Sequence, residues 1–290
     1  MIYVSTSNGI YFFNELDLKP EKLQTSKDSL GYYGLAYNKS KKQLLIASRA
    51  KLRFTFKSMK RSSDVSLLAF NEKSESVDHL ADFYKVYDVH QIALYEDKLF
   101  ITDTSLNRIH IYDLSSKKKL TILNLGRIRK DVHHINTIKI HNSSLLIGLN
   151  NRGDKESEVM FIPLEKINYS RKKIDAFNIF EKIIKINGLY HSHDLEPFND
   201  DFLINSSHDS QVVSFKTGKS LLKTSGFSRG LAIDTKFIYV GISPLVSRSE
   251  RYSKTIDGKV QLFDFKTFKL VHEIILPGAN QVNDILITKN

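Results

Sequence analysis

Short apolar runs separated by polar turns recur along the chain and predict β-hairpins. Three stretches show the pattern clearly: VHQIALYEDKLFITDT from Val89, SHDLEPFNDDFLINSS from Ser192 and SRGLAIDTKFIYVGIS from Ser228. Each has a polar start, a short apolar run, a polar turn and a second apolar run. Apolar runs of this length, bounded by turn residues, are typical of paired β-strands.

The spacing within these hairpins is constant and identifies further copies. Corresponding apolar residues stand eight positions apart in four units: Ile92 and Phe100, Ile138 and Leu146, Leu195 and Leu203, and Leu231 and Tyr239. A looser copy runs from Leu35 to Leu45. A sixth begins at QVNDILITKN, and MIYVSTS, at the other end of the chain, supplies its second run. Hairpins that share one register and close across the chain ends are typical of a ring of sheets.

Third apolar runs follow every hairpin, and weaker fourth runs such as KLTILNL and LVHEIIL follow several. Four short strands repeated six times predict an all-β fold, a six-bladed β-propeller whose N-terminal strands complete the last blade. We expect residues 1–290 to form one such domain. A generic β-sandwich is the alternative, and the common register argues against it. The main helical candidate, RKKIDAFNIFEKIIKING from Arg171, is predicted to be an irregular fourth strand with a long connection.

Composition restricts the remaining classes of function. The chain has no cysteine, which excludes a disulfide scaffold, a thiolate metal site and a cysteine nucleophile. The first residues show no basic segment followed by a long apolar one, and no apolar run is long enough to span a membrane. We therefore expect a cytoplasmic protein without membrane insertion. A phosphate-binding glycine loop is also missing, so no nucleotide cofactor is expected.

The common register places one polar residue of each unit at the entrance of the predicted central channel. The residue at this ring position differs between units: Tyr33, His90, Asn136, His193, Arg229 and Asn283. The residues two positions earlier are expected on the same side of each strand, and they include Asp88, His134 and His191. The next position after the ring includes Asp194 and Asp284. Four of the ten histidines therefore gather at one place, although any propeller channel has a polar, water-filled lining.

The gathered histidines permit three kinds of chemistry. His90, His191 and His193 could ligate a divalent metal, for which zinc, manganese or iron is favoured over calcium because calcium prefers oxygen ligands. A histidine pair could instead act as general base and acid. Alternatively, the histidines and Arg229 could simply bind an anion.

Basic residues concentrate in loops that the propeller topology places over the same face. The net charge is +11, from 43 Lys and Arg against 32 Asp and Glu, and a lysine-rich surface would explain part of it. Two loops carry arginines that could hold an anion: Arg49 and Arg53 in the first, and Arg248 and Arg251 in the fifth. Nucleic acid is a competing partner, because Phe54, Phe56 and Tyr252 in these loops could stack on bases.

The hairpins SRGLAIDTKFIYVGIS and GLAYNKSKKQLLIAS resemble the inner hairpins of NHL-repeat and gluconolactonase-type propellers. That resemblance implies a six-bladed fold, a channel calcium and lactone or ester hydrolysis. Arg229 stands where the family has an asparagine, so lactonase activity is not carried over. The C-terminal half also resembles uncharacterised bacterial propellers associated with glycosyltransferases, which implies a role in carbohydrate metabolism.

These observations predict an enzyme that acts at the channel mouth on an anionic small molecule or glycan end. The reaction is hydrolysis, elimination or isomerisation. The predicted catalytic residues are His90, His191 and His193, assisted by His134 and Asp194. The predicted substrate-binding residues are Arg229, Arg49, Arg53, Arg248, Arg251, Tyr33, Asn136 and Asn283. The alternatives are a non-catalytic propeller that binds an acidic protein, a glycan or nucleic acid through its basic loops, and a scaffold that uses its blade edges.

Overall fold

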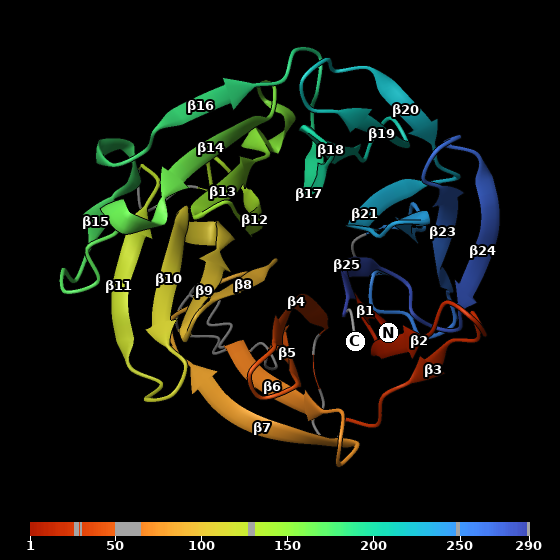
Figure 1. Cartoon of the computed structure of the whole chain (residues 1–290), viewed down its shortest axis with the longest axis horizontal. Helices are drawn as coiled ribbons and strands as arrows, with labels where there is room; N and C mark the ends of the chain where they lie inside the picture. The colour runs from red at the N-terminus through yellow and green to blue at the C-terminus, as the bar shows by residue number, and fades with distance from the viewer. Residues whose placement is uncertain (26–28, 30, 50–64, 127–130, 248–249, 289–290) are drawn as a thin grey trace.

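The structure is a computed structural model that describes residues 1–25, 29, 31–49, 65–126, 131–247 and 250–288. Six small sheets, antiparallel apart from one short parallel pair, stand around a central channel as the blades of a propeller (Figure 1). The innermost strand of each blade is its first, and these strands contact one another in the order β4, β8, β12, β17, β21, β25 and back to β4. The predicted all-β, six-bladed fold is confirmed.

The first three blades follow the chain order. Blade 1 consists of β4 (Tyr32–Asn38), β5 (Gln43–Arg49), β6 (Val65–Asn71) and β7 (Ser76–Phe83). Blade 2 consists of β8 (Ile92–Tyr95), β9 (Lys98–Asp103), β10 (Arg108–Asp113), β11 (Lys119–Asn124) and β15 (Ile174–Asp175). Blade 3 consists of β12 (Ile135–His141), β13 (Ser144–Leu149), β14 (Glu158–Pro163) and β16 (Lys182–Lys185).

The last three blades continue round the ring. Blade 4 consists of β17 (Ser192–Phe198), β18 (Asp201–Ser206), β19 (Gln211–Ser214) and β20 (Ser220–Lys223). Blade 5 consists of β21 (Phe227–Ile233), β22 (Phe237–Ser243), β23 (Gly258–Asp264) and β24 (Leu270–Leu276). Blade 6 consists of β25 (Val282–Ile287), β1 (Ile2–Thr6), β2 (Ile10–Phe13) and β3 (Glu21–Lys22). The helical segments of the described chain are four 3-10 helices: η1 (Thr104–Leu106), η2 (Asn151–Gly153), η3 (Leu164–Lys166) and η4 (Ala176–Asn178).

Ring closure joins the two chain ends, as the sequence predicts. Strand β25 pairs antiparallel with β1, so that Val4 lies opposite Ile285. The Met1 and Thr288 backbones also exchange hydrogen bonds, with N···O distances of 3.1 and 2.9 Å. One C-terminal strand and three N-terminal strands therefore form blade 6.

Burial explains why inner and outer strands have different sequences. Strands β1 and β5 lie between neighbouring blades and are apolar on both faces, which is the pattern of sheets covered on two sides. The outermost strands β7 and β24 have mostly exposed or half-buried side chains. Tyr3, Leu35 and Leu44 belong to one cluster that joins blades 6 and 1, and similar clusters join other neighbours. The core therefore runs as a ring between the blades.

The predicted irregular fourth strand of the third unit is only partly as expected. Strand β16 is indeed the outer strand of blade 3, antiparallel to β14. The residues before it form β15, which pairs in parallel with β11 and gives blade 2 a fifth strand. A 3-10 turn at η4 separates the two short strands. The helical spacing of this segment reflects apolar residues shared between two sheets.

Candidate functional site at the channel mouth

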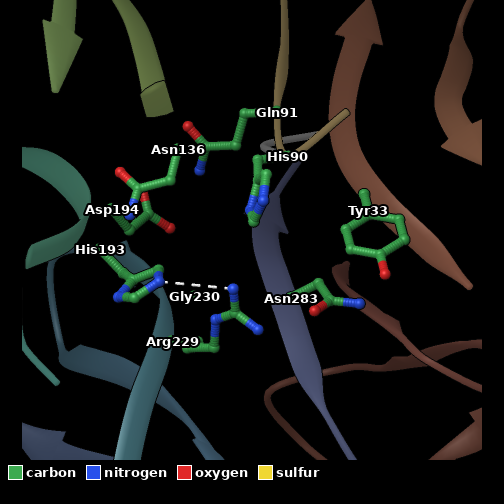
Figure 2. Close-up of a pocket in the computed structure, with 9 residues that line it drawn as sticks. All are labelled: Tyr33, His90, Gln91, Asn136, His193, Asp194, Arg229, Gly230 and Asn283. Carbon is green, nitrogen blue, oxygen red and sulfur yellow. Dashed lines mark hydrogen bonds between the residues drawn. The ribbon is translucent and has the colours of Figure 1, made fainter. Parts of the chain in front are cut away.

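One residue from each blade lines a small cavity at the mouth of the channel (Figure 2). These residues are the six predicted at the ring position: Tyr33, His90, Asn136, His193, Arg229 and Asn283. In five blades the pairing of the first strand shifts register at this point, as at Ser228/Leu231 and Ile135/Thr137. A β-bulge re-aims a side chain. The repeated bulge therefore turns the ring residues into the channel.

Gln91, Asp194 and Gly230 complete the lining and form part of a narrow waist below the ring. At the waist, side chains from alternate blades accept a backbone N–H from the next blade. Gln91 Oε1 accepts from Ile138 N at 2.9 Å, Asp194 Oδ2 from Leu231 N at 2.8 Å, and Asp284 Oδ2 from Leu35 N at 2.8 Å. These bonds fix the spacing of the first strands and hence of the ring.

Arg229 is the central cation of the mouth. Its Nη2 lies 3.4 Å from His193 Nε2 and its Nη1 lies 3.5 Å from Gln281 Oε1, and the guanidinium carbon is 5.9 Å from the centre of the Phe227 ring. Burial, followed by the neighbouring Arg251 and Arg49, lowers the pKa of Arg229 to about 10, although Tyr33 opposes this shift. The guanidinium stays charged at neutral pH. It forms no ion pair with any carboxylate in the described part of the chain.

His193 is held as one neutral tautomer. Ser207 Oγ donates to the Ser228 carbonyl at 2.7 Å, so it accepts from His193 Nδ1, which is 2.7 Å away. The His191 carbonyl lies 3.2 Å from the same nitrogen. Burial, then Arg229, holds the pKa of His193 well below its usual value of 6.5. Its unprotonated Nε2 therefore faces the mouth and accepts from Arg229.

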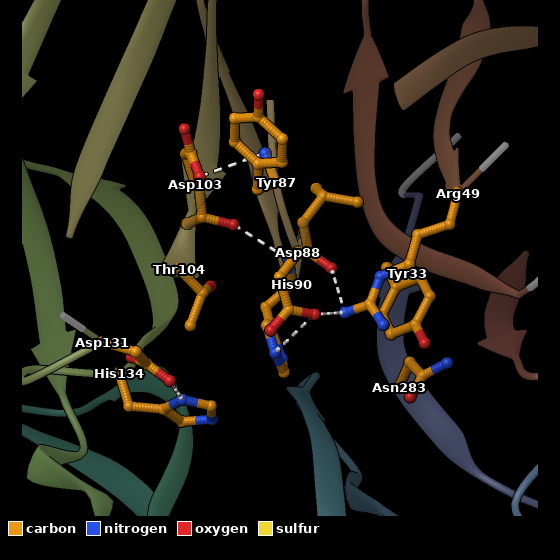
Figure 3. A network of polar contacts seen from close by, with 12 residues as sticks. Tyr33, Arg49, Tyr87, Asp88, His90, Asp103, Thr104, Asp131, His134 and Asn283 are labelled. Carbon is orange, nitrogen blue, oxygen red and sulfur yellow. Dashed lines mark hydrogen bonds and ion pairs between the residues drawn. The ribbon is translucent and has the colours of Figure 1, made fainter. Parts of the chain in front are cut away.

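His90 is a second neutral imidazole in the lining. Burial lowers its pKa well below 6.5, and His134, Arg49 and Arg229 add to the effect. Its ring packs edge-on against His134 and Tyr33, with centroid separations of 5.3 and 6.0 Å. Asp88 Oδ1 is 3.8 Å from His90 Nε2 and forms an ion pair with Arg49 (Figure 3).

Arg49 belongs to this network rather than to a free basic loop. It ends β5, its guanidinium carbon lies 3.9 Å from the centre of the Tyr33 ring, and it also donates to the Val89 carbonyl at 3.1 Å. Because Asp88 matches its charge, Arg49 supports Tyr33 and contributes less to anion binding than predicted. Arg251 lies on the exposed loop after β22 and is close enough to affect the pKa of Arg229 and His90. The predicted Arg53 and Arg248 lie outside the described residues.

The neutral ring residues are held by the backbone. Asn136 Nδ2 donates to the Ser192 carbonyl at 2.7 Å, and Asn283 Nδ2 donates to the Tyr32 carbonyl at 2.8 Å. The Tyr33 hydroxyl lies 3.4 Å from that of Tyr252, on the loop that carries Arg251. Burial raises the pKa of Tyr33, so its hydroxyl remains a hydrogen-bond donor at neutral pH. The mouth thus has fixed amides and one phenol around a single unmatched cation.

His191 does not line the cavity, whereas His134 lies beside His90. His191 precedes β17 with φ +54°, and His134 precedes β12 with φ +45°, so neither follows the alternation of an extended strand. His191 packs against His208, with ring centroids 4.2 Å apart, and covers Gly153, where an added Cβ would lie 2.1 Å from its Nε2. His134 hydrogen-bonds to Asp131 at 2.8 Å. The prediction that His191 and His193 point the same way is therefore wrong.

This arrangement does not fit the metal site expected from His90, His191 and His193. Within the described residues, no three His, Asp or Glu side chains converge as a metal site. His191 faces away, and the Nε2 of His193 meets a guanidinium, which would repel a divalent cation. Asp194 lines the mouth, and its carboxylate also accepts backbone N–H groups within the waist.

Several residues that shape the site were absent from the predicted set. Gln91 and Gly230 stand one position after ring residues and could have been found from the register. Gln281 stands two positions before the ring residue Asn283 and could also have been found from the register, whereas Tyr252 was considered only as a base-stacking residue. Ser207 lies outside the repeated positions, so the repeat gave no signal for it.

Comparisons with known proteins support the fold alone. No family model matches the chain, and no curated protein matches it. The structure is similar to a chain in the crystal structure of a nidogen/laminin complex, with TM-score 0.66 and 11% identity over 98% of this chain and 96% of that one. It is also similar to a protein of unknown function from Bacteroides caccae, with TM-score 0.62 and 11% identity over 98% and 97% of the chains. The resemblance to NHL-repeat and gluconolactonase-type propellers stays a prediction. The described residues include no helix long and apolar enough to cross a membrane.

Proposed function

We propose that the channel mouth binds the anionic group of a small molecule or glycan end. The observation that carries the proposal is the guanidinium of Arg229, which is charged, largely enclosed and unmatched by a described carboxylate. Arginine presents paired donors that suit carboxylate and phosphate oxygens. Among the described residues, the acceptors of its N–H groups lie at 3.4 and 3.5 Å and are weak, so an anion can take these N–H groups at little cost.

The size of the mouth limits what reaches Arg229. The enclosed cavity measures about 10 Å³, which is about the space of one water molecule. A single carboxylate or phosphate oxygen fits there, and the body of the ligand would lie outward, beside Tyr252 and Arg251. A chain end or a small acid suits this shape better than the side of a nucleic-acid duplex.

Titration with acetate and methyl phosphate tests the proposal. Calorimetry should show binding to the wild-type protein and a loss of affinity of about ten- to hundred-fold in Arg229→Gln, because a charge-assisted pair is removed. Arg171→Gln, which changes an exposed arginine outside the lining, is the matched control. Equal affinity of Arg229→Gln and wild type would refute an anion site centred on Arg229.

Acid–base catalysis at the same site is the second candidate, and the fixed tautomer of His193 favours it. A general base needs an unprotonated nitrogen aimed at the substrate, and Ser207 and Ser228 hold Nε2 in that state. His193 would accept a proton from the bound molecule as the general base of a hydrolysis, elimination or isomerisation.

A panel of phosphomonoesters, lactones and unsaturated uronates distinguishes catalysis from binding. For an enzyme, turnover of one class should disappear in His193→Gln while anion affinity stays within about threefold of wild type. Absence of turnover across the panel, with binding intact, would favour a binding propeller. A propeller of similar extent occurs in the nidogen/laminin complex, which is consistent with that second outcome.

A further inference from the structure

A second, larger cavity occupies the channel on the other side of the waist. It measures about 170 Å³ and shares Gln91 and Asp194 with the mouth. Polar and apolar surface both line it, and its larger apolar side chains come from the first strands of blades 1, 2, 3 and 6: Leu35, Ile92, Ile138, Ile140, Ile285 and Leu286. Three charged residues also line it, Lys139, Asp194 and Asp284.

Asp284 presents an unpartnered oxygen to this cavity. Its side chain is nearly enclosed, since the residue is only 7% exposed. Oδ2 accepts the Leu35 N–H, whereas Oδ1 makes no hydrogen bond or ion pair with any residue that the structure describes. A buried carboxylate oxygen without a donor is costly unless a ligand or water supplies one.

The other charges of the cavity are already matched. Lys139 forms an ion pair with Glu196, so the two together add no net charge. Asp194 accepts the N–H groups of Leu195 and Leu231, each at 2.8 Å, and also bonds to Gln91. The unmatched group is therefore Asp284.

We propose that this cavity binds a small organic cation, an ammonium or guanidinium on a compact apolar body, through Asp284. Oδ1 would accept from the cationic group, and the aliphatic walls would cover the body. A volume of about 150 Å³ has room for a six-carbon ring, so the ligand should have about six heavy atoms. This site is independent of the anion site proposed at the mouth.

Binding of a cation to Asp284 should release a proton, and this release can be measured. Burial, and then Asp194, raise the pKa of Asp284 well above its usual value of 3.8, which favours the protonated carboxyl before a cation binds. Glu196 raises it further, while Lys139 and the Leu35 N–H oppose the shift. An ammonium ion that binds to the carboxylate displaces this proton into solvent. Affinity should therefore increase with pH, and up to about one proton should be released per ligand.

Cyclopentylammonium is a suitable probe, with cyclopentanol and cyclopentanecarboxylate as neutral and anionic controls of similar size. Calorimetry in two buffers of different ionisation enthalpy should show binding of the ammonium alone, with proton release. Asp284→Asn keeps an acceptor for the Leu35 N–H but removes the charge, so it should weaken binding about tenfold or more. Asp78→Asn, at an exposed position of β7, is the matched control. Acetate binding at the mouth should be unchanged in both variants.

NMR of the wild-type protein keeps the proposal testable even if Asp284→Asn does not fold. The ammonium probe should shift the methyl signals of Ile92, Ile138, Ile140 and Ile285 and leave those of buried isoleucines outside the cavity unchanged. Three results would overturn the proposal: absence of shifts at these methyls, equal affinity of Asp284→Asn and wild type, or displacement of the probe by micromolar calcium or magnesium.

Discussion

The mouth of the channel and the cavity beyond the waist are built on the same first strands, yet they differ in charge. At the mouth, the ring residues present the unmatched Arg229 between two neutral imidazoles. Directly after the ring residue Asn283, Asp284 of the waist has one carboxylate oxygen without a described partner and lines the cavity. Between them, Gln91, Asp194 and Asp284 bond to neighbouring backbones. A bulge followed by a hydrogen-bonded waist thus lets one ring of strands display two opposite electrostatic sites.

The largest loss of stability is expected at Asp194, which lines both the mouth and the cavity. Asp194→Ala would leave the Leu231 and Leu195 N–H groups and Gln91 without their acceptor in a buried position. We expect a loss of about 3 to 5 kcal/mol of unfolding free energy, measured by urea denaturation. Asp194→Asn should lose clearly less, because an amide oxygen can still accept. If both variants were as stable as wild type, the waist would not fix the ring.

The folded protein should become more stable when the carboxyl of Asp284 in the cavity is removed. The folded-state pKa of Asp284 is raised above 3.8, so its contribution to stability is present at low pH and is lost as pH rises through the raised pKa. Asp284→Asn should therefore gain about 1 to 2 kcal/mol at pH 8 and nothing near pH 3. Denaturation of the variant and wild type at the two pH values measures this; a constant difference would contradict it.

The contribution of the mouth histidines, His90 and His193, to stability should have the opposite dependence on pH. The folded-state pKa values of His90 and His193 lie below 6.5, so their contribution to stability is present above pH 6.5 and is lost as the pH falls toward the depressed values. Wild-type protein should lose stability between pH 7 and pH 5, and His193→Gln should lose less. Anion affinity should increase over the same interval, since a bound anion favours the protonated imidazoles. Urea denaturation and acetate titration at pH 7 and pH 5 would check that stability falls and that acetate affinity rises at the lower pH.

The smallest expected effect on anion affinity distinguishes His191 from His193, which stand two positions apart in the sequence. His191→Ala should change acetate affinity by less than about twofold, because His191 packs on His208 and Gly153 away from the lining. Ser207→Ala should weaken it more, by about threefold, because His193 then loses the acceptor that fixes its tautomer. Calorimetry on the two variants measures both losses of acetate affinity. A larger loss in His191→Ala than in Ser207→Ala would show that His191 belongs to the anion site.

The fold and the six ring residues were predictable because both depend on a repeated local register. Each unit repeats the hairpin and its bulge, so Tyr33, His90 and Arg229 could be aligned without any knowledge of distances. The packing of His191 against His208 was not predictable from this register, since His191 has a left-handed backbone and precedes the extended strand. Strand alternation describes extended residues only.

Ion pairs between residues of different blades could not be predicted from the sequence either. Arg49 and Asp88 lie on neighbouring blades, and nothing in either unit alone indicates their ion pair. The same holds for Lys139 and Glu196, which the sequence places on separate strands and the structure joins inside the channel. Asp284 could be assigned to the channel, but the matching of every other charge around it required the structure.

Closure of the ring has a consequence for the order in which the protein matures. Strand β25 supplies Asn283 to the mouth and Asp284 to the opposite cavity, and it is the last strand along the chain. During synthesis, blades 1 to 5 and the three N-terminal strands emerge before either site has all of its residues. Neither the mouth nor the cavity therefore has its full lining before β25 is synthesised.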